Sequence, residues 1–285
     1  MTMARTQLVR RLAGCAALVA ALGSGTAVAQ EWWYAGSLRV ATGDYGGDDD
    51  ITTLILTNEV GWQRGAWFVG LAVPVISQDS PDLRYLGGGP MPVGGGHGGS
   101  MHGPGHPGPG GGGHHHPAPE QRDLADPELA DPTVTVGLDL YRDPFDRTRI
   151  VVLGAVKAPV SDLDDGFGTG EWDGGIGALW SRRVGAGRLW AEGWWWRLGD
   201  PEEVDLRDPL SLELGWRRLV ADGRSSLQLV LRGRTEVADG GEELAAASVG
   251  FSRSLGRRTW VLAEVEGGLT DAAPDLAVAV GIGLR

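Results

Sequence analysis

Six histidines are the residues of this chain best suited to hold a metal ion. They are His97, His102, His106, His114, His115 and His116. Neutral imidazole is a good ligand for Zn, Cu and Ni, but glycine surrounds these side chains and their spacing is loose. Ordering such a segment around an ion costs backbone entropy. We therefore expect it to bind a divalent transition metal only weakly, with no cofactor required. The alternative is a spacer whose histidines only change charge at about pH 6.5.

A second group of candidate residues is charged and lies in segments of alternating polarity. From Leu210 to Arg217, every even position is apolar and every odd position is polar or glycine. This is the period of side chains on the two faces of a β-strand. Extended to the other segments, it places one set of charged side chains on a common face: Glu59, Asp139, Lys157, Asp173, Glu192, Glu213, Arg217, Arg232, Arg234, Glu264 and Glu266. Inside a barrel, such charges either line a water-filled path or pair with one another and close it.

Twelve strands must position these residues. The predicted ranges are 33–42, 51–62, 66–77, 133–141, 149–158, 172–182, 188–197, 209–219, 225–235, 243–253, 258–267 and 274–284. Connections after odd strands are long and rich in acids, whereas those after even strands are short. Ten-residue alternating segments, an even strand number and this alternation of loops are typical of an outer-membrane barrel. The sequence therefore predicts an all-β fold, an antiparallel transmembrane β-barrel of about twelve strands.

Tryptophans lie near the ends of many predicted strands. We expect them to form interfacial girdles around the barrel, with a soluble β-sandwich core as the alternative. They are Trp33, Trp62, Trp67, Trp172, Trp180, Trp216 and Trp260. The run Trp194-Trp195-Trp196 is ambiguous, because adjacent strand residues face opposite ways.

The first 29 residues predict export. Arginines precede an apolar run from Leu12 to Leu22, and small residues end in Ala27-Val28-Ala29. This order predicts a cleaved signal peptide over residues 1–29, because the apolar run is shorter than the roughly 20 residues of a membrane helix. Cys15, the one cysteine of the chain, then belongs to the signal peptide. We expect residues 30–285 to form a barrel in the outer membrane of a Gram-negative bacterium.

One long connection has an unusual composition. Residues 87–119 consist mainly of glycine and proline and contain all six histidines. Such a segment cannot bury a core. We expect a disordered Gly/Pro/His-rich loop on the extracellular side of the barrel.

Two classes of function are disfavoured. The formal net charge of -12 at pH 7 argues against nucleic-acid binding, which needs clustered Lys and Arg. An enzyme with an activated nucleophile needs a base beside it, and no histidine lies in the predicted barrel wall.

Several short strings also resemble a known family. They are Thr42-Gly43-Asp44-Tyr45-Gly46, Val73-Pro74-Val75, Lys157-Ala158-Pro159, Gly168-Thr169-Gly170-Glu171-Trp172-Asp173 and Gly199-Asp200-Pro201. Together they resemble the transporter-like outer-membrane barrels grouped with the MetA-pathway phenol-degradation family. The resemblance implies a barrel that passes small, hydrophobic molecules, and it brings no catalytic residues. Unlike such barrels, which commonly end in an aromatic residue, this chain ends in Gly283-Leu284-Arg285.

These observations favour passive passage of a small-molecule solute through an outer-membrane pore or transporter-like barrel. Two alternatives stay open, a surface barrel that captures transition metals and a structural barrel without transport. The expected partners are outer-membrane lipid and lipopolysaccharide, the barrel assembly machinery and the solute.

Overall fold

The fold is taken from a computed structural model of the chain. The structure describes residues 30–47, 49–80, 83–86, 89–92, 124, 126–161, 167–199, 206–220, 222–238 and 241–285. Within these ranges, no helix has the length and apolar character needed to cross a membrane.

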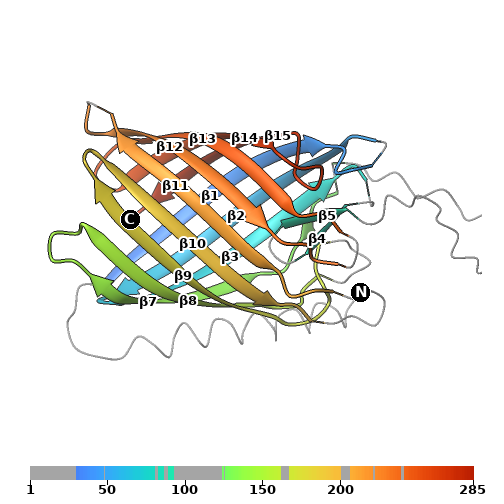
Figure 1. Cartoon of the computed structure of the whole chain (residues 1–285), viewed down its shortest axis with the longest axis horizontal. Helices are drawn as coiled ribbons and strands as arrows, with labels where there is room; N and C mark the ends of the chain where they lie inside the picture. Colours follow the sequence, from blue (N-terminus) through green and yellow to red (C-terminus); the bar gives the residue numbers. More distant parts are fainter. Residues whose placement is uncertain are drawn as a thin grey trace, which may run out of the picture.

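A closed antiparallel barrel forms the body of the molecule (Figure 1). Its twelve wall strands are β1 (Gln30–Gly43), β2 (Ile51–Arg64), β3 (Trp67–Gln78), β7 (Thr133–Arg142), β8 (Thr148–Lys157), β9 (Asp173–Val184), β10 (Gly187–Arg197), β11 (Leu210–Leu219), β12 (Ser225–Arg234), β13 (Leu244–Ser254), β14 (Thr259–Gly268) and β15 (Leu276–Leu284). Each wall strand pairs with the next, and β1 pairs with β15 to close the sheet. The predicted fold class is confirmed, and each predicted strand end lies within about three residues of the observed one.

The two ends of the barrel differ in their connections. Short turns join β2 to β3, β7 to β8, β9 to β10, β11 to β12 and β13 to β14. We call this the short-turn end, and it lies at the left of Figure 1. Gly65 and Gly185 each open a two-residue turn with a positive φ, which a tight hairpin with glycine at its first central position requires. The longer connections meet at the opposite end, which we call the loop end.

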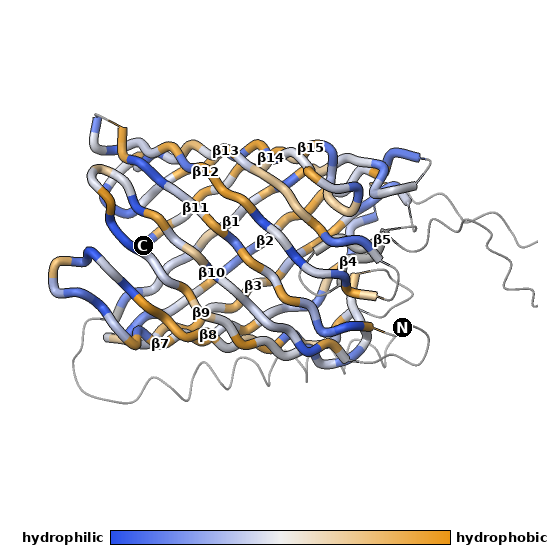
Figure 2. The backbone as a smooth tube through the Cα atoms, in the orientation of Figure 1, coloured by the Kyte–Doolittle hydropathy of each residue, from blue (hydrophilic) through white to orange (hydrophobic). Residues whose placement is uncertain are grey.

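Hydropathy alternates along the wall strands (Figure 2). On β11, for example, Leu210, Leu212 and Leu214 are 56%, 50% and 43% exposed, whereas Gly215 is buried. The same alternation runs along β8, where Val152 and Val156 are exposed and Val151 and Leu153 are buried. Apolar side chains on the outer face can bury their surface only in lipid, as transmembrane barrels require.

Three short strands were not predicted from the sequence. β4 (Leu83–Leu86) and β5 (Gly89–Pro92) form a hairpin, and β6 (Glu128–Leu129) adds to β3. The β5 strand begins inside the 87–119 stretch that was expected to be a disordered loop, so the loop contains one short hairpin strand. Gly87-Gly88 in the sequence is a favoured hairpin pair, and it was read only as part of the glycine-rich composition. The remainder of that stretch lies outside the described residues.

Apolar clusters anchor the loop end to the wall. Ile76, Ala130 and Phe167 form one cluster, and Ile55 packs against it. Leu198, Leu206 and Val237 form another around the connections that follow β10 and β12. Burial of these side chains holds the connections against the strands, so the loop end is a packed rim.

Candidate functional site: the barrel lumen

The strand register decides which side chains face the lumen. Directly opposite partners on neighbouring strands point to the same side of a sheet, so one inward residue fixes a whole row. Glu59 pairs with Ala72, and Glu192 pairs with Glu213. Followed around the barrel, the register places every predicted lumen-lining residue on the inner face: Glu59, Asp139, Lys157, Asp173, Glu192, Glu213, Arg217, Arg232, Arg234, Glu264 and Glu266. Their contacts with other residues are found at three levels along the barrel.

The middle level is an ion-pair network around Arg232. Its guanidinium contacts Glu213 at 3.0 Å, Glu264 at 2.9 Å and also Glu266. Arg39 on β1 contacts Glu266 at 2.5 Å, across β15. Two arginines thus serve three carboxylates, which leaves this wall acidic and fixed in geometry.

The loop-end level is a buried cluster around Lys157. Its ammonium lies 2.6 Å from Asp173 and 3.4 Å from Asp131. Asp173 also accepts hydrogen bonds from the Thr169 hydroxyl and the Gly199 N–H. Burial raises the pKa of Asp131, and the charge of Lys157 opposes this shift. Because Lys157 and Asp173 are 8% and 1% exposed, this pair ties the connections to the wall and does not line an open path.

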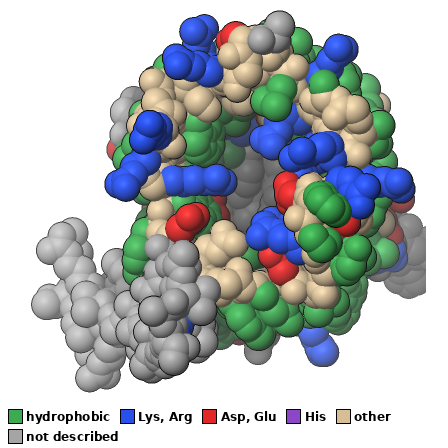
Figure 3. Space-filling view, turned by 90° about the vertical axis from the view of Figure 1, so that its left-hand side faces the viewer, with side chains coloured by type: hydrophobic (Ala, Val, Ile, Leu, Met, Phe, Trp, Pro, Cys, Tyr) green, Lys and Arg blue, Asp and Glu red, His purple; other side chains and the backbone are tan. Residues whose placement is uncertain are grey.

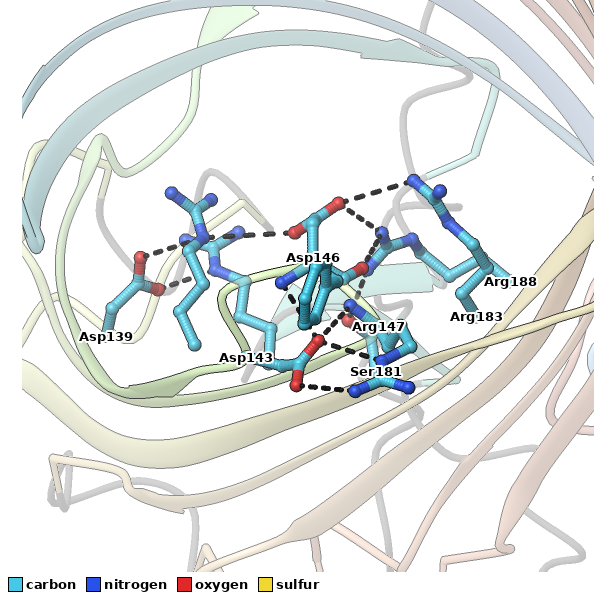
Figure 4. Close-up of polar contacts among 10 residues, drawn as sticks. Asp139, Asp143, Asp146, Arg147, Ser181, Arg183 and Arg188 are labelled. Carbon is cyan, nitrogen blue, oxygen red and sulfur yellow. Dashed lines mark hydrogen bonds and ion pairs between the residues drawn. The ribbon is translucent and has the colours of Figure 1, made fainter.

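The short-turn level is rich in arginine. Figure 3 looks into this end and shows a hollow framed by basic side chains, which are arginines because the single lysine, Lys157, is buried at the loop end. Arg183, Arg188 and Arg217 are successive cross-strand partners on β9, β10 and β11. The Asp146 carboxylate reaches in from the β7–β8 turn and lies 2.6 Å from Arg188 and 3.6 Å from Arg183 (Figure 4).

The same turn is held together by its own charges. Arg147 donates a hydrogen bond to Asp143 at 3.1 Å, and this bond lowers the pKa of Asp143. Arg149 contacts Asp139 at 2.5 Å at the base of the turn. These contacts position Asp146 beside the arginines of the mouth.

Tryptophans line the lumen as well as the membrane face. The register turns Trp33, Trp190, Trp194, Trp196 and Trp260 inward. The prediction of an interfacial girdle is therefore wrong for Trp33 and Trp260, because both side chains face the lumen. Trp194 and Trp196 face the lumen and stack with ring centroids 5.5 Å apart, while Trp195 between them is exposed on the outer face.

Each inward indole lies against a cross-strand glycine. A Cβ atom added at Gly215 would lie 1.9 Å from the Trp190 ring, and one at Gly61 or Gly283 would lie 2.1 Å from Trp33 or Trp260. Indole N–H groups then reach carboxylates, because Trp190 donates to Glu213 at 2.9 Å and Trp194 to Glu192 at 2.7 Å. The rings lie flat on the wall and narrow the lumen less than upright rings would.

A cavity of about 340 Å³ opens beside two of these rings. Its lining includes Trp33, Trp260, Glu59 and Gln63 on the inner face, together with Arg285. An apolar groove of about 780 Å³ lies elsewhere, lined largely by outward residues such as Trp180, Leu229 and Val249. That groove faces the membrane and contributes nothing to the lumen.

The inward tryptophans and Arg183, Arg188 and Arg39 were missed as lining residues from the sequence. The alternation of side chains along a strand could have identified several of them, because residues two positions apart face the same side. Trp194 and Trp196 share the parity of Glu192, and Trp260 shares that of Glu264 and Glu266.

The predicted metal ligands, His97 to His116, lie outside the described residues. Among the residues that the structure describes, no group of three His, Cys, Asp or Glu side chains is arranged to hold a metal ion. Metal binding by the histidines therefore stays a prediction.

Comparisons with known proteins bear on the fold. No family model matches the chain, and no curated protein matches it either. Among solved structures, an outer membrane channel from Pseudomonas putida F1 matches with a TM-score of 0.58 at 10% identity, covering 91% of this chain and 96% of that one.

Two porin structures match less well. The NanC porin has a TM-score of 0.48 at 9% identity and covers 90% of this chain and all of its own. The KdgM porin has a TM-score of 0.46 at 8% identity, with 88% and 98% covered. The fold assignment thus rests on the first match, and it confirms at the level of fold the barrel that the family resemblance implied. The chain has the barrel fold of an outer membrane channel.

Proposed function

We propose that the protein is a passive pore for small molecules in the outer membrane of a Gram-negative bacterium. The proposal rests on the different residues that cover the outer and inner faces of a closed barrel. Apolar side chains cover its outer face, whereas charged, hydroxyl, indole and glycine residues, with some apolar ones, occupy its inner face, and the short-turn end is hollow (Figure 3). A wall of this kind suits lipid outside and solute inside.

The inner wall has two unlike sides. β3 presents half-buried apolar residues, namely Phe68, Ala72 and Pro74. β11 to β14 present the Arg232 network. A solute with an apolar body and a polar group can contact both sides, so the geometry favours small amphipathic molecules over simple hydrocarbons.

The location, topology and partners belong to the same proposal. A signal peptide over residues 1–29 would export the chain, and the assembly machinery would insert it. The short-turn end would then lie in the periplasm, and the loop end would contact lipopolysaccharide. No enzymatic step is proposed, because all six histidines lie in residues 97–116 and none is in the barrel wall.

Single-channel current in a planar bilayer tests the proposal. The wild-type protein should conduct, and Ala279→Trp should roughly halve the conductance, because Ala279 lies on the inner face opposite Arg39 and Glu264 and a bulky ring there narrows the path.

The matched control is Ala263→Trp. Ala263 is exposed on the outer face of the neighbouring strand, so the same ring would enter lipid and leave the current unchanged. Absence of current in wild-type protein, or equal currents in the two variants, would contradict a pore through the lumen.

A further inference from the structure

Three arginines stand in a row on the inner face at the short-turn end. Arg183 pairs directly with Arg188, and Arg188 pairs directly with Arg217. Directly opposite side chains have Cβ atoms about 5 Å apart, and like charges at that spacing repel one another. Such a row is unfavourable unless negative charge compensates it.

The negative charge near these arginines lies on one side of the row. Asp146 contacts Arg183 and Arg188 with its carboxylate, and its backbone carbonyl also accepts a hydrogen bond from Arg188 at 3.0 Å. Arg217 has no hydrogen bond or ion pair with any residue in the described part of the chain. It instead experiences the positive charges of Arg188 and Arg285. Its side chain is exposed at the mouth, so its guanidinium can meet a solute.

An aromatic surface lies one step deeper along the same face. Trp190 and Gly215 form the next inward pair after Arg188 and Arg217. Two residues along a strand span about 7 Å, which matches the length of a small aromatic acid. The Trp190 ring lies flat over Gly215, and its N–H bond to Glu213 fixes its orientation.

We infer that Arg188, Arg217 and Trp190 form a subsite for a small organic carboxylate with a flat apolar body. The guanidinium of Arg217 binds the carboxylate through paired N–H donors, Arg188 adds charge, and the apolar body stacks on Trp190. A single negative charge fits better than a dianion, because Asp146 already neutralises part of the row and the acidic Arg232 network lies deeper. The inference names a solute class for the proposed pore and rests on that function.

Binding to the full-length protein in detergent tests the subsite. Benzoate, benzyl alcohol and sulfate serve as probes in calorimetric titrations. Benzoate should bind, whereas benzyl alcohol, which lacks the charge, should bind about tenfold more weakly. Sulfate should bind more weakly than benzoate.

Three variants on the same strand sharpen the test. Arg217→Gln should weaken benzoate binding about tenfold, and Arg217→Lys should restore only part of it, because lysine keeps the charge without the planar fork. Arg218→Gln is the matched control, since Arg218 is adjacent but faces outward, and it should bind benzoate like the wild type.

A fourth variant probes the aromatic part. Trp190→Leu should weaken benzoate binding about threefold and leave acetate binding unchanged. Heat-dependent gel mobility of each variant shows whether the barrel has folded, and only folded variants are compared.

Equal losses in Arg217→Gln and Arg218→Gln would overturn the subsite, since they would reveal only a general effect of surface charge. Tighter binding of sulfate than of benzoate would also overturn it and would assign the row to inorganic dianions. Titration in detergent requires no conduction. A protein that conducts without binding benzoate would therefore contradict this inference alone, and one that binds without conducting would contradict the pore.

Discussion

At the scale of single residues, the inner wall depends on glycines that make room for indole rings. Trp190 can lie flat only because Gly215 has no Cβ, and the flat ring places its N–H on Glu213. A glycine in a strand normally weakens the strand. Here the glycine weakens the strand but allows an aromatic ring to lie flat in a narrow lumen.

Gly215→Ala should therefore destabilise the barrel by about 1–3 kcal/mol, because the new Cβ displaces the Trp190 ring. Urea unfolding followed by tryptophan fluorescence measures the change. Gly154→Ala is the control, since nothing lies within 4 Å of a Cβ at Gly154. The double variant Gly215→Ala/Trp190→Leu should lose less free energy of unfolding than its two single variants lose together. Strict additivity would show that the ring and the glycine are independent.

At the scale of elements, the β11–β12 turn is stabilised by Asp222. Its carboxylate accepts hydrogen bonds from the Ser225 hydroxyl at 2.6 Å and from the Ser225 and Arg224 N–H groups. These bonds lower the pKa of Asp222 from 3.8 to about 2. The turn should thus keep its full stabilisation above pH 3.8 and lose it as the pH falls towards 2.

Amide exchange at Ser225 as a function of pH measures this loss. Protection, corrected for the intrinsic pH dependence of exchange, should decline between pH 3.8 and about 2. Asp222→Asn, which has no titrating carboxyl group, should show no such decline. A decline of equal size in the asparagine variant would assign the pH dependence to another group.

The strands were predictable because alternation and connection length are local properties of the sequence. The short hairpin of β4 and β5 was hidden, because proline and glycine dominate its strand Gly89–Pro92 and mask any period of two. The direction of single tryptophans was missed for another reason. Indole is apolar enough for lipid and polar enough for a lumen, so residue type alone does not choose the face, and only the register does.

The interactions between charges were less predictable than their positions. The alternation of side chains placed Lys157 and Arg232 on the inner face. It could not show that Lys157 is buried between carboxylates or that Arg232 lies in the middle of the lumen. Which partners meet depends on strand tilt and stagger around the closed barrel, and a single strand does not encode these quantities.

At the scale of the whole molecule, the histidine-rich segment is a single connection between β5 and β6 whose composition differs from that of the barrel wall. Deletion of residues 94–116 should abolish copper or nickel binding while barrel assembly and pore current stay intact. Copper should bind with higher affinity than nickel and zinc, following the general order of affinities. Calorimetry on full-length and deleted protein measures uptake. Equal metal uptake by both proteins would refute the role of the histidines and leave the segment as a spacer.

Closure of the barrel between its first and last strands has a consequence for assembly. Tyr34 pairs with Leu284 and Thr42 with Leu276, so this seam joins parts of the chain far apart in sequence. Loop-closure entropy grows slowly, by about 0.6 kcal/mol for each doubling of length, and the seam is therefore not intrinsically weak. Until it forms, however, β1 and β15 present unpaired N–H and C=O groups that hydrocarbon cannot solvate. Insertion into the bilayer and sealing of the seam must then be coupled, and a half-closed sheet would survive in the membrane only while another strand covers its edges.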